Sequence, residues 1–399
     1  MSSRRPLRYH LGDSGDAVGE IRALLARQGL VTIGTSEPPG GADAPTGAEA
    51  LTFDSALDRA VRTFQQQRGL TVDGVVGPQT YRVLDEARWR IGDRLLTHVP
   101  GTLMSGDDVL ALQQRLLGLG FQAGRADGLF GPRTEGAVRD FQRNIGVPPD
   151  GTCGPATLKA LSRLTPRVEG GRPNAMRAEE RIRRDGPRLT GKVVVIDAAP
   201  TRAVDPALAA SAASITLDLA RRVEGRLNAT GVQALLTHAD ASGEEAPTEV
   251  ERAEFANRTD ANLLVSLHLD AADNPEASGV STYFYGLDAQ GVRSTVGERF
   301  ASLVQREIVA RTDLVDLRSH PKTWDLLRRT RMPAVRVDVG YVTNPRDEAR
   351  LSDPAFRDVV AEAVVVAVQR VYLSPETDAK TGLLRFSELR AAVRGGRTT

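Results

Sequence analysis

Three polar residues that could bind a ligand or move a proton stand at or near the ends of apolar runs. They are Asp197, His268 and Asp338. Imidazole and carboxylate groups can serve as metal ligands or as general acids and bases. A histidine at the end of a strand is more often a structural residue with satisfied hydrogen bonds. These positions are therefore candidates for chemistry only if the fold brings them together.

The elements that would position these side chains alternate between strand and helix patterns. Short apolar runs and amphipathic segments succeed one another over residues 192–197, 217–227, 232–236, 249–257, 262–268, 300–310, 334–340 and 356–372. This alternation predicts an α/β domain with a mostly parallel sheet. Active sites in such sheets gather at the carboxyl ends of the strands, so we expect the three candidates at one edge.

The first half of the chain contains a module that occurs twice. Phe64-Gln65 and Asp73-Gly74 each recur 77 positions later, whereas Gly15-Asp16 recurs 91 positions later. The difference predicts an insertion in the first copy, in the loop-like stretch 38–45. Apolar residues three or four apart, with tight glycine turns between them, predict three helices in each copy. Asp107 or Asp108 is the expected N-cap of one of them.

The composition is typical of globular protein with more than one core. The 399 residues include 52 basic and 51 acidic side chains, for a net charge of +1. Such a balance argues against nucleic acid as the main partner. The single Cys153 leaves no pair for a disulfide or a thiolate metal site. No apolar run reaches the ~20 residues of a membrane-spanning helix, and no apolar segment follows the basic N-terminus, which predicts a cytoplasmic protein without a secretory signal.

These patterns divide the chain into five parts. We expect two repeats over residues 8–90 and 95–168, a linker over 169–190, the α/β domain over 191–373 and a flexible tail over 374–399. The linker is predicted from its Arg, Pro and Gly content, and the tail from its polar residues.

The two repeats resemble the peptidoglycan-binding domain, a three-helix module found beside many wall hydrolases. The resemblance rests on AVRTFQQQRGLTVDGVVGPQTYRVL and AVRDFQRNIGVPPDGTCGPATLKAL. The first copy lacks the earlier Asp-Gly turn, because Phe53 stands where Phe130 does and is preceded by Leu51-Thr52. Since the shared residues belong to the framework, the resemblance implies the fold more strongly than it implies sugar binding.

A second resemblance rests on ERAEFANRTDANLLVSLHLDA and LLRRTRMPAVRVDVGYVTNPRDEARL. Residues 191–373 resemble the family-3 N-acetylmuramoyl-L-alanine amidases, zinc enzymes that cut the bond between muramic acid and the stem peptide. The resemblance implies a His ligand after the first strand, a Glu ligand on the next helix and a His ligand in a Ser-Leu-His stretch. A further Glu would act as general base on the zinc-bound water. Three protein ligands leave one position for that water.

Residue by residue, the resemblance implies a degenerate site. Pro200 stands at the first His ligand and Ala212 at the Glu ligand, so His268 is the only retained ligand position. Asp338 stands at the general-base position, one methylene shorter than Glu. Because a lone imidazole holds zinc too weakly, we expect no catalytic metal. His238 or His320 could in principle supply replacement ligands.

An actinobacterial subtype of these proteins pairs two repeats with a degenerate amidase domain and has no signal peptide. The stretch TWDLLRRTRMPAVRVDVGYVTNP resembles this subtype. The resemblance implies a non-catalytic cytoplasmic activator of UDP-N-acetylglucosamine enolpyruvyl transferase, the enzyme that opens peptidoglycan precursor synthesis. It also implies control by a serine/threonine kinase, with Thr381 favoured over Thr377 as the modified residue. An ordinary disordered terminus explains the polar tail equally well.

Two other functions stay open at this point. The first is a zinc-dependent N-acetylmuramoyl-L-alanine amidase with unrecognised ligands, for which His268 and Asp338 would both be essential. Zinc is expected as a cofactor only in this case. The second is a receptor that binds peptidoglycan or muropeptides through the two repeats.

Overall fold

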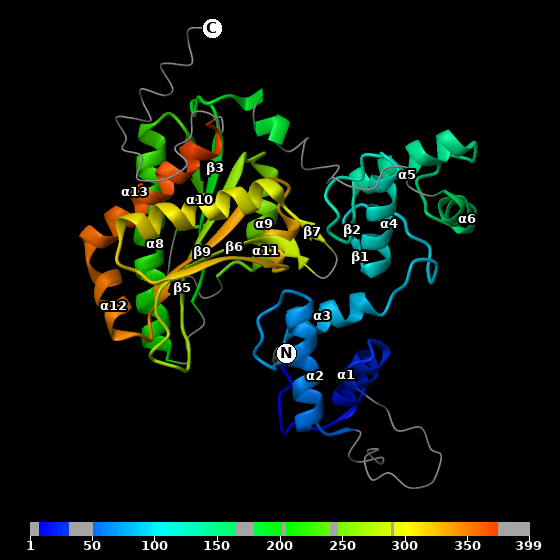
Figure 1. Ribbon diagram of the computed structural model, residues 1–399, viewed down its shortest axis with the longest axis horizontal. Helices are drawn as coiled ribbons and strands as arrows, with labels where there is room; N and C mark the ends of the chain where they lie inside the picture. The colour runs from blue at the N-terminus through cyan, green and yellow to red at the C-terminus, as the bar shows by residue number, and fades with distance from the viewer. Residues whose placement is uncertain are drawn as a thin grey trace. The chain divides into compact units, whose positions relative to one another are not determined.

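The computed structural model describes residues 8–31, 51–164, 179–182, 184–201, 205–239, 246–288 and 291–373 (Figure 1). The chain divides into two compact units, Met1–Asn174 with Leu287–Val292, and Ala175–Gly286 with Arg293–Thr399. Within the described ranges, no helix is both long and apolar enough to cross a bilayer. Parts of the predicted linker and the whole predicted tail, including Thr377 and Thr381, lie outside the described residues.

The first unit contains the two predicted repeats, and each has the three predicted helices. The first repeat has α1 (Asp16–Arg27), α2 (Ser55–Gln67) and α3 (Pro78–Ala87), and the second has α4 (Asp107–Gly118), α5 (Pro132–Ile145) and α6 (Pro155–Arg163). A two-stranded sheet, β1 (Met104–Ser105) with β2 (Leu129–Phe130), completes the second repeat. The predicted N-cap is wrong: Gly106 caps α4, and the carboxylates of Asp107 and Asp108 instead bind Arg68 and Arg94.

Three glutamines hold the Asp-Gly turns of the repeats. Each side-chain amide nitrogen lies within hydrogen-bonding distance of the turn's Asp carboxylate, of a backbone carbonyl two residues further on, and of a Thr in the next helix. The glutamine carbonyl accepts from the turn's glycine N–H. The sets are Gln65 with Asp73-Gly74, Gln113 with Asp127-Gly128 and Gln142 with Asp150-Gly151. The three turn glycines have φ of 72°, 69° and 79°, in the left-handed region that favours glycine.

The turn missing from the first repeat is replaced by an arginine. The 91-residue offset places Arg22 opposite Gln113. The Arg22 guanidinium donates to the Thr52 carbonyl at 2.8 Å and to the Asp54 carboxylate at 2.9 Å. Because Arg22 is 4% exposed, this contact replaces the absent glutamine contact from inside the core. The first repeat thus keeps its three helices with a different loop before α2.

The second unit is built on a seven-stranded, mostly parallel sheet, as predicted. Its order is β4-β3-β5-β9-β6-β7, with β8 paired to β6. Only the β6–β9 pair among the registered pairs of this sheet is antiparallel. The strands are β3 (Val193–Ala198), β4 (Gln233–Leu236), β5 (Leu263–Asp270), β6 (Val280–Leu287), β7 (Val292–Arg293), β8 (Asp316–Lys322) and β9 (Ala334–Tyr341).

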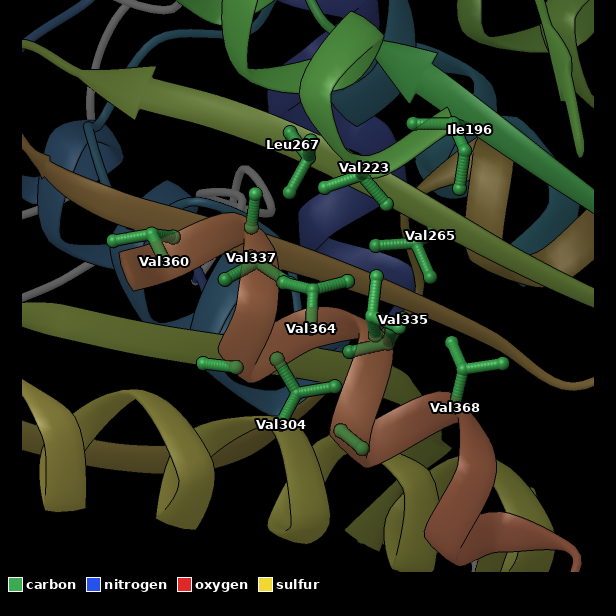
Figure 2. Packing of buried hydrophobic residues seen from close by; sticks show 14 of the residues in the cluster. Ile196, Val223, Val265, Leu267, Val304, Val335, Val337, Val360, Val364 and Val368 are labelled. Carbon is green, nitrogen blue, oxygen red and sulfur yellow. The ribbon is translucent and has the colours of Figure 1, made fainter. Parts of the chain in front are cut away.

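The helices of this unit are α8 (Pro206–Ala229), α9 (Glu249–Arg258), α10 (Thr295–Arg311), α11 (Asp325–Arg329), α12 (Pro345–Ser352) and α13 (Pro354–Val371). Figure 2 shows α13 packed on the sheet, where Val364 and Val368 meet Val335 of β9. Val223 of α8 and Val304 of α10 belong to the same buried cluster. Every other residue of β9 thus contributes to an apolar core, which leaves the alternate residues for the opposite face.

Strands β6, β7 and β8 were not predicted from the sequence. β8 carries Ser319, His320 and Pro321, and only one of its seven residues is apolar other than proline. Such a segment shows neither an apolar run nor a clean alternation, so its pairing with β6 depends on the tertiary fold. The predicted strands and helices of this unit otherwise appear within a few residues of their expected places, with α8 beginning 11 residues earlier than predicted.

Candidate functional site

The parallel pairing of β5 and β9 brings two of the three candidates together. His268 and Asp338 are direct register partners, and both are buried, at 5% and 2% exposure. The alternation of β9 places Val335, Val337 and Val339 in the apolar core, so Arg336 and Asp338 share the other face. His268 and Asp338 therefore meet at the carboxyl end of the sheet, as expected.

An arginine that the sequence analysis did not single out lies between these two residues. The Arg336 guanidinium donates from Nε to Asp338 Oδ1 at 2.7 Å and from Nη2 to Asp338 Oδ2 at 3.2 Å. The same Nη2 lies 2.7 Å from His268 Nδ1. The pairing with the carboxylate is bidentate, which fixes the plane of the guanidinium. Arg336 and Asp338 thus bind one another along β9, and Arg336 also contacts His268 on β5.

The contact with the imidazole fixes the role of His268 Nδ1. A second distance, 3.2 Å from Nδ1 to Asp338 Oδ1, would suit an ion pair with a protonated histidine. One nitrogen cannot both donate to Asp338 and accept from Arg336. Because guanidinium does not lose its proton in proteins and its contact is the shorter, we assign Nδ1 as the acceptor. The lone pair that could bind a metal at Nδ1 is therefore taken by Arg336.

The electrostatics of Asp338 follow from this pairing. Burial alone would raise the pKa of the Asp338 carboxyl, but the Arg336 charge opposes it and the pKa is lowered. At Asp270, burial and then the negative charge of Asp338 raise the pKa of the carboxyl group. Arg336 lowers the pKa of both carboxyl groups, but only at Asp338 does its effect outweigh that of burial.

Asp270 is the site residue that the sequence analysis missed. It follows His268 by two positions on β5, so both side chains face the same way. Ligand atoms of His268, Asp270 and Asp338 lie within 4.8 Å of one another, and no other such group of metal-binding side chains occurs in the described ranges. The spacing of two along a predicted strand was the available signal.

The zinc that the family resemblance implies does not fit this arrangement. A divalent ion would need the imidazole lone pair of His268, which already accepts from Arg336, and would have to share the Asp338 carboxylate with the same guanidinium. At ~4 Å, a charge of +2 and a guanidinium repel by about 8 kcal/mol at an effective dielectric constant of ~20. Complete four-ligand structural sites gain about 10–16 kcal/mol from zinc. Three donor side chains that face a fixed cation would therefore bind zinc with little net free energy.

The two positions where ligands were expected to be lost carry no donor toward this group. Pro200 follows β3 and is exposed, and Ala212 is fully buried in α8. Neither side chain has an atom that could coordinate an ion. The backbone carbonyl of Ala212 accepts instead from Thr216 Oγ1 at 2.8 Å.

The possible replacement ligands do not join the group either. His238 Nδ1 contacts Thr237 Oγ1 at 2.9 Å, and exposed His320 contacts the Leu317 carbonyl through Nε2 at 2.6 Å. Neither belongs to the group formed by His268, Asp270 and Asp338. Both imidazoles thus have local partners.

The third candidate, Asp197, is a structural acid at the end of β3. Its carboxylate is fully buried and accepts from Ser266 Oγ at 2.6 Å and from Thr237 Oγ1 at 2.7 Å. The Arg252 guanidinium of α9 forms an ion pair with the same carboxylate. With these donors around it, Asp197 ties α9 to the sheet.

An aromatic wall covers Arg336. The Trp324 ring lies over the guanidinium, with 4.4 Å from Arg336 Cζ to the ring centroid. Tyr283, the register partner of Arg336 on β6, packs against Trp324 at a centroid distance of 4.7 Å. Burial and then the charge of Arg336 lower the pKa of Lys322 on β8. The guanidinium is therefore held by hydrogen bonds to Asp338 and His268 and is covered on one face by the Trp324 ring.

Comparison with known proteins matches both units. Residues 194–370 match the family described as N-acetylmuramoyl-L-alanine amidase, and residues 14–84 and 105–161 match the putative peptidoglycan binding domain. The chain is 45% identical over 390 residues to the N-acetylmuramoyl-L-alanine amidase CwlM of Mycobacterium tuberculosis, covering 95% of this chain and 93% of that protein. It is 28% identical over 150 residues to the amidase LytC of Bacillus subtilis, covering 38% of this chain and 29% of that one. The solved catalytic domain of CwlV from Bacillus (Paenibacillus) polymyxa var. colistinus is 27% identical, with a TM-score of 0.39, over 44% of this chain and 96% of that one.

Proposed function

Because this chain belongs to the N-acetylmuramoyl-L-alanine amidase family, we propose that it is a non-catalytic member that regulates peptidoglycan precursor synthesis. The observation that carries the proposal is the guanidinium of Arg336, which binds the two residues of the former catalytic centre. Pro200 and Ala212, which lack donor atoms, support it further. An amidase of this family needs a metal-bound water, and this site offers neither an open metal position nor a full ligand set.

The regulatory part of the proposal rests on the resemblance of the sequence to a degenerate actinobacterial subtype. The proposed partner is UDP-N-acetylglucosamine enolpyruvyl transferase, which the chain would activate in the cytoplasm. A serine/threonine kinase would control this activation through Thr381 or Thr377. A phosphate adds charge and strong acceptor oxygens, and can dock on arginine side chains.

Loss of catalysis is tested with the purified full chain and muropeptides. The chain should release no stem peptide, with or without added zinc, while an active family member run in parallel should release it. Zinc-dependent release that disappears in both His268→Ala and Asp338→Asn would overturn the proposal and establish the amidase alternative.

Activation is tested with the transferase itself. The phosphorylated full chain should raise the transferase rate, and the unphosphorylated chain should not. Thr381→Ala should remove this response, whereas Thr377→Ala serves as the matched control and should retain it. An unchanged transferase rate in every arm, with peptidoglycan captured by the full chain, would favour the receptor alternative.

A further inference from the structure

The former catalytic centre contains side chains that could hold a metal ion. It also contains a cation that prevents metal binding. His268, Asp270 and Asp338 offer one imidazole nitrogen and two carboxylates within 4.8 Å of one another. Such a nitrogen and oxygen set suits divalent zinc, cobalt, iron or manganese. The Arg336 guanidinium lies among these donors and binds two of them, at 2.7 Å to His268 and 2.7 Å to Asp338.

We propose that Arg336 is a resident cation in place of a metal ion, and that it keeps a latent His268–Asp270–Asp338 divalent-metal site closed. The inference deepens the proposed function, since it assigns the absence of a metal to one side chain. The ligands missing at positions 200 and 212 would by themselves still leave the three donors His268, Asp270 and Asp338. Arg336 makes these donors unavailable to a metal ion as well.

Three contacts show that the guanidinium is built into the site. Its bidentate pairing with Asp338 fixes its plane, and the contact with His268 fixes its direction toward β5. The Trp324 ring covers one face at 4.4 Å. The side chain is only 17% exposed, so it is not a mobile surface arginine that folds back onto a nearby acid. A single positive charge thereby offsets the Asp338 carboxylate that a metal would otherwise balance.

The same geometry indicates how the site would respond to removal of the guanidinium. His268 and Asp270 come from alternate positions of β5, and Asp338 is the register partner of His268 on β9. Their placement follows from the pairing of β5 with β9, in which the register shifts between His268 and Asp270. A methionine at position 336 has a similar length but no charge and no donor, so the lone pairs of His268 and Asp338 would become free for an ion.

The experiment measures metal binding by the full chain, with Co²⁺ as a spectroscopic probe and Zn²⁺ as a competitor. Arg336→Met should bind one Co²⁺ per chain with visible d–d absorption, which Zn²⁺ should abolish. The wild type and Arg336→Lys, which keeps the positive charge, should bind none. Adding Asp270→Asn to Arg336→Met should weaken binding by roughly 100-fold or more, because loss of an outer-shell partner alone costs 10–100-fold.

The folded state of each variant is checked by far-ultraviolet circular dichroism and by a cooperative urea unfolding transition, and Arg336→Gln provides a second neutral variant. Folded Arg336→Met and Arg336→Gln that both fail to bind Co²⁺ would overturn the latent site, while the proposed loss of catalysis would stand. Binding in Arg336→Met that survives Asp270→Asn would also overturn it. Stoichiometric Co²⁺ or Zn²⁺ in the wild type would overturn both this inference and the proposed function.

Discussion

At the scale of single residues, the site at the ends of β5 and β9 is an ion pair whose arginine also binds an imidazole. Asp338 is 3% exposed at its side chain and Arg336 17%, and the two are joined by 2.7 Å and 3.2 Å hydrogen bonds. Buried pairs of this kind contribute little relative to an apolar pair, but removing one partner leaves an uncompensated charge. The stability of this unit should therefore depend strongly on both members being present.

Asp338→Asn should destabilise the sheet unit by about 3 kcal/mol, because it leaves the Arg336 charge without its carboxylate. The measurement is urea unfolding of the full chain, followed by Trp324 fluorescence in a Trp89→Phe background. The matched control is Asp140→Asn, which breaks an exposed pair with Arg143 and should leave the Trp324 transition unchanged. An equal effect of the two substitutions would contradict the burial argument.

The same pair predicts a particular acid dependence. Arg336 is the main charge that opposes burial and lowers the pKa of Asp338 to about 2, against ~3.9 for an unfolded Asp. A depressed pKa gives stability that is complete above the unfolded pKa and is lost as the pH falls through the folded pKa. The stability difference between wild type and Asp338→Asn should thus be constant from pH 7 to about 5. It should shrink between about pH 4 and pH 2, and a difference that grows on acidification would exclude this assignment.

At the scale of elements, the sequence predicted most of the framework and half of the site. Apolar runs predicted β3, β5 and β9, and repeated turns predicted six helices of the first unit, because these patterns are local. The pairing of His268 with Asp338 can be predicted only once β5 and β9 are known to be neighbours. Arg336 and Asp270 were within reach of the alternation argument. The Trp324 ring that covers the guanidinium lies outside both strands, so alternation along β9 does not reveal it.

The glutamine contacts predict how the second repeat responds to mutation. Burial raises the pKa of the Cys153 thiol to about 12, so the folded chain should react very slowly with iodoacetamide at pH 8. Gln142→Ala removes the contacts to the Asp150-Gly151 turn two residues before Cys153, and should cost about 1–3 kcal/mol. The alkylation rate of Cys153 should rise, by about tenfold for each 1.4 kcal/mol if the repeat opens as a unit.

The control for this effect is Gln65→Ala, which removes the equivalent contacts in the first repeat. It should leave the Cys153 alkylation rate unchanged. A similar rise with Gln65→Ala would mean that the two repeats open together.

At the scale of the whole molecule, the chain combines two peptidoglycan-binding repeats with an amidase-family sheet unit. Glutamines hold three turns of the repeats and Arg22 takes the place of a fourth glutamine. In the sheet unit, Asp197 binds Arg252 and Ser266, and His268 lies beside Asp338. An amidase-family fold whose metal-binding side chains face Arg336 suits a protein that acts by binding, which is why regulation is the function we propose.

We propose that this amidase-family chain holds no metal ion. Native mass spectrometry of the full chain, after dialysis against micromolar zinc and then against metal-free buffer, distinguishes a metal-free chain from a zinc-bound one. The expected mass is that of the polypeptide alone. A mass increased by one zinc ion per chain, which reverts in both His268→Ala and Asp338→Asn, would contradict it.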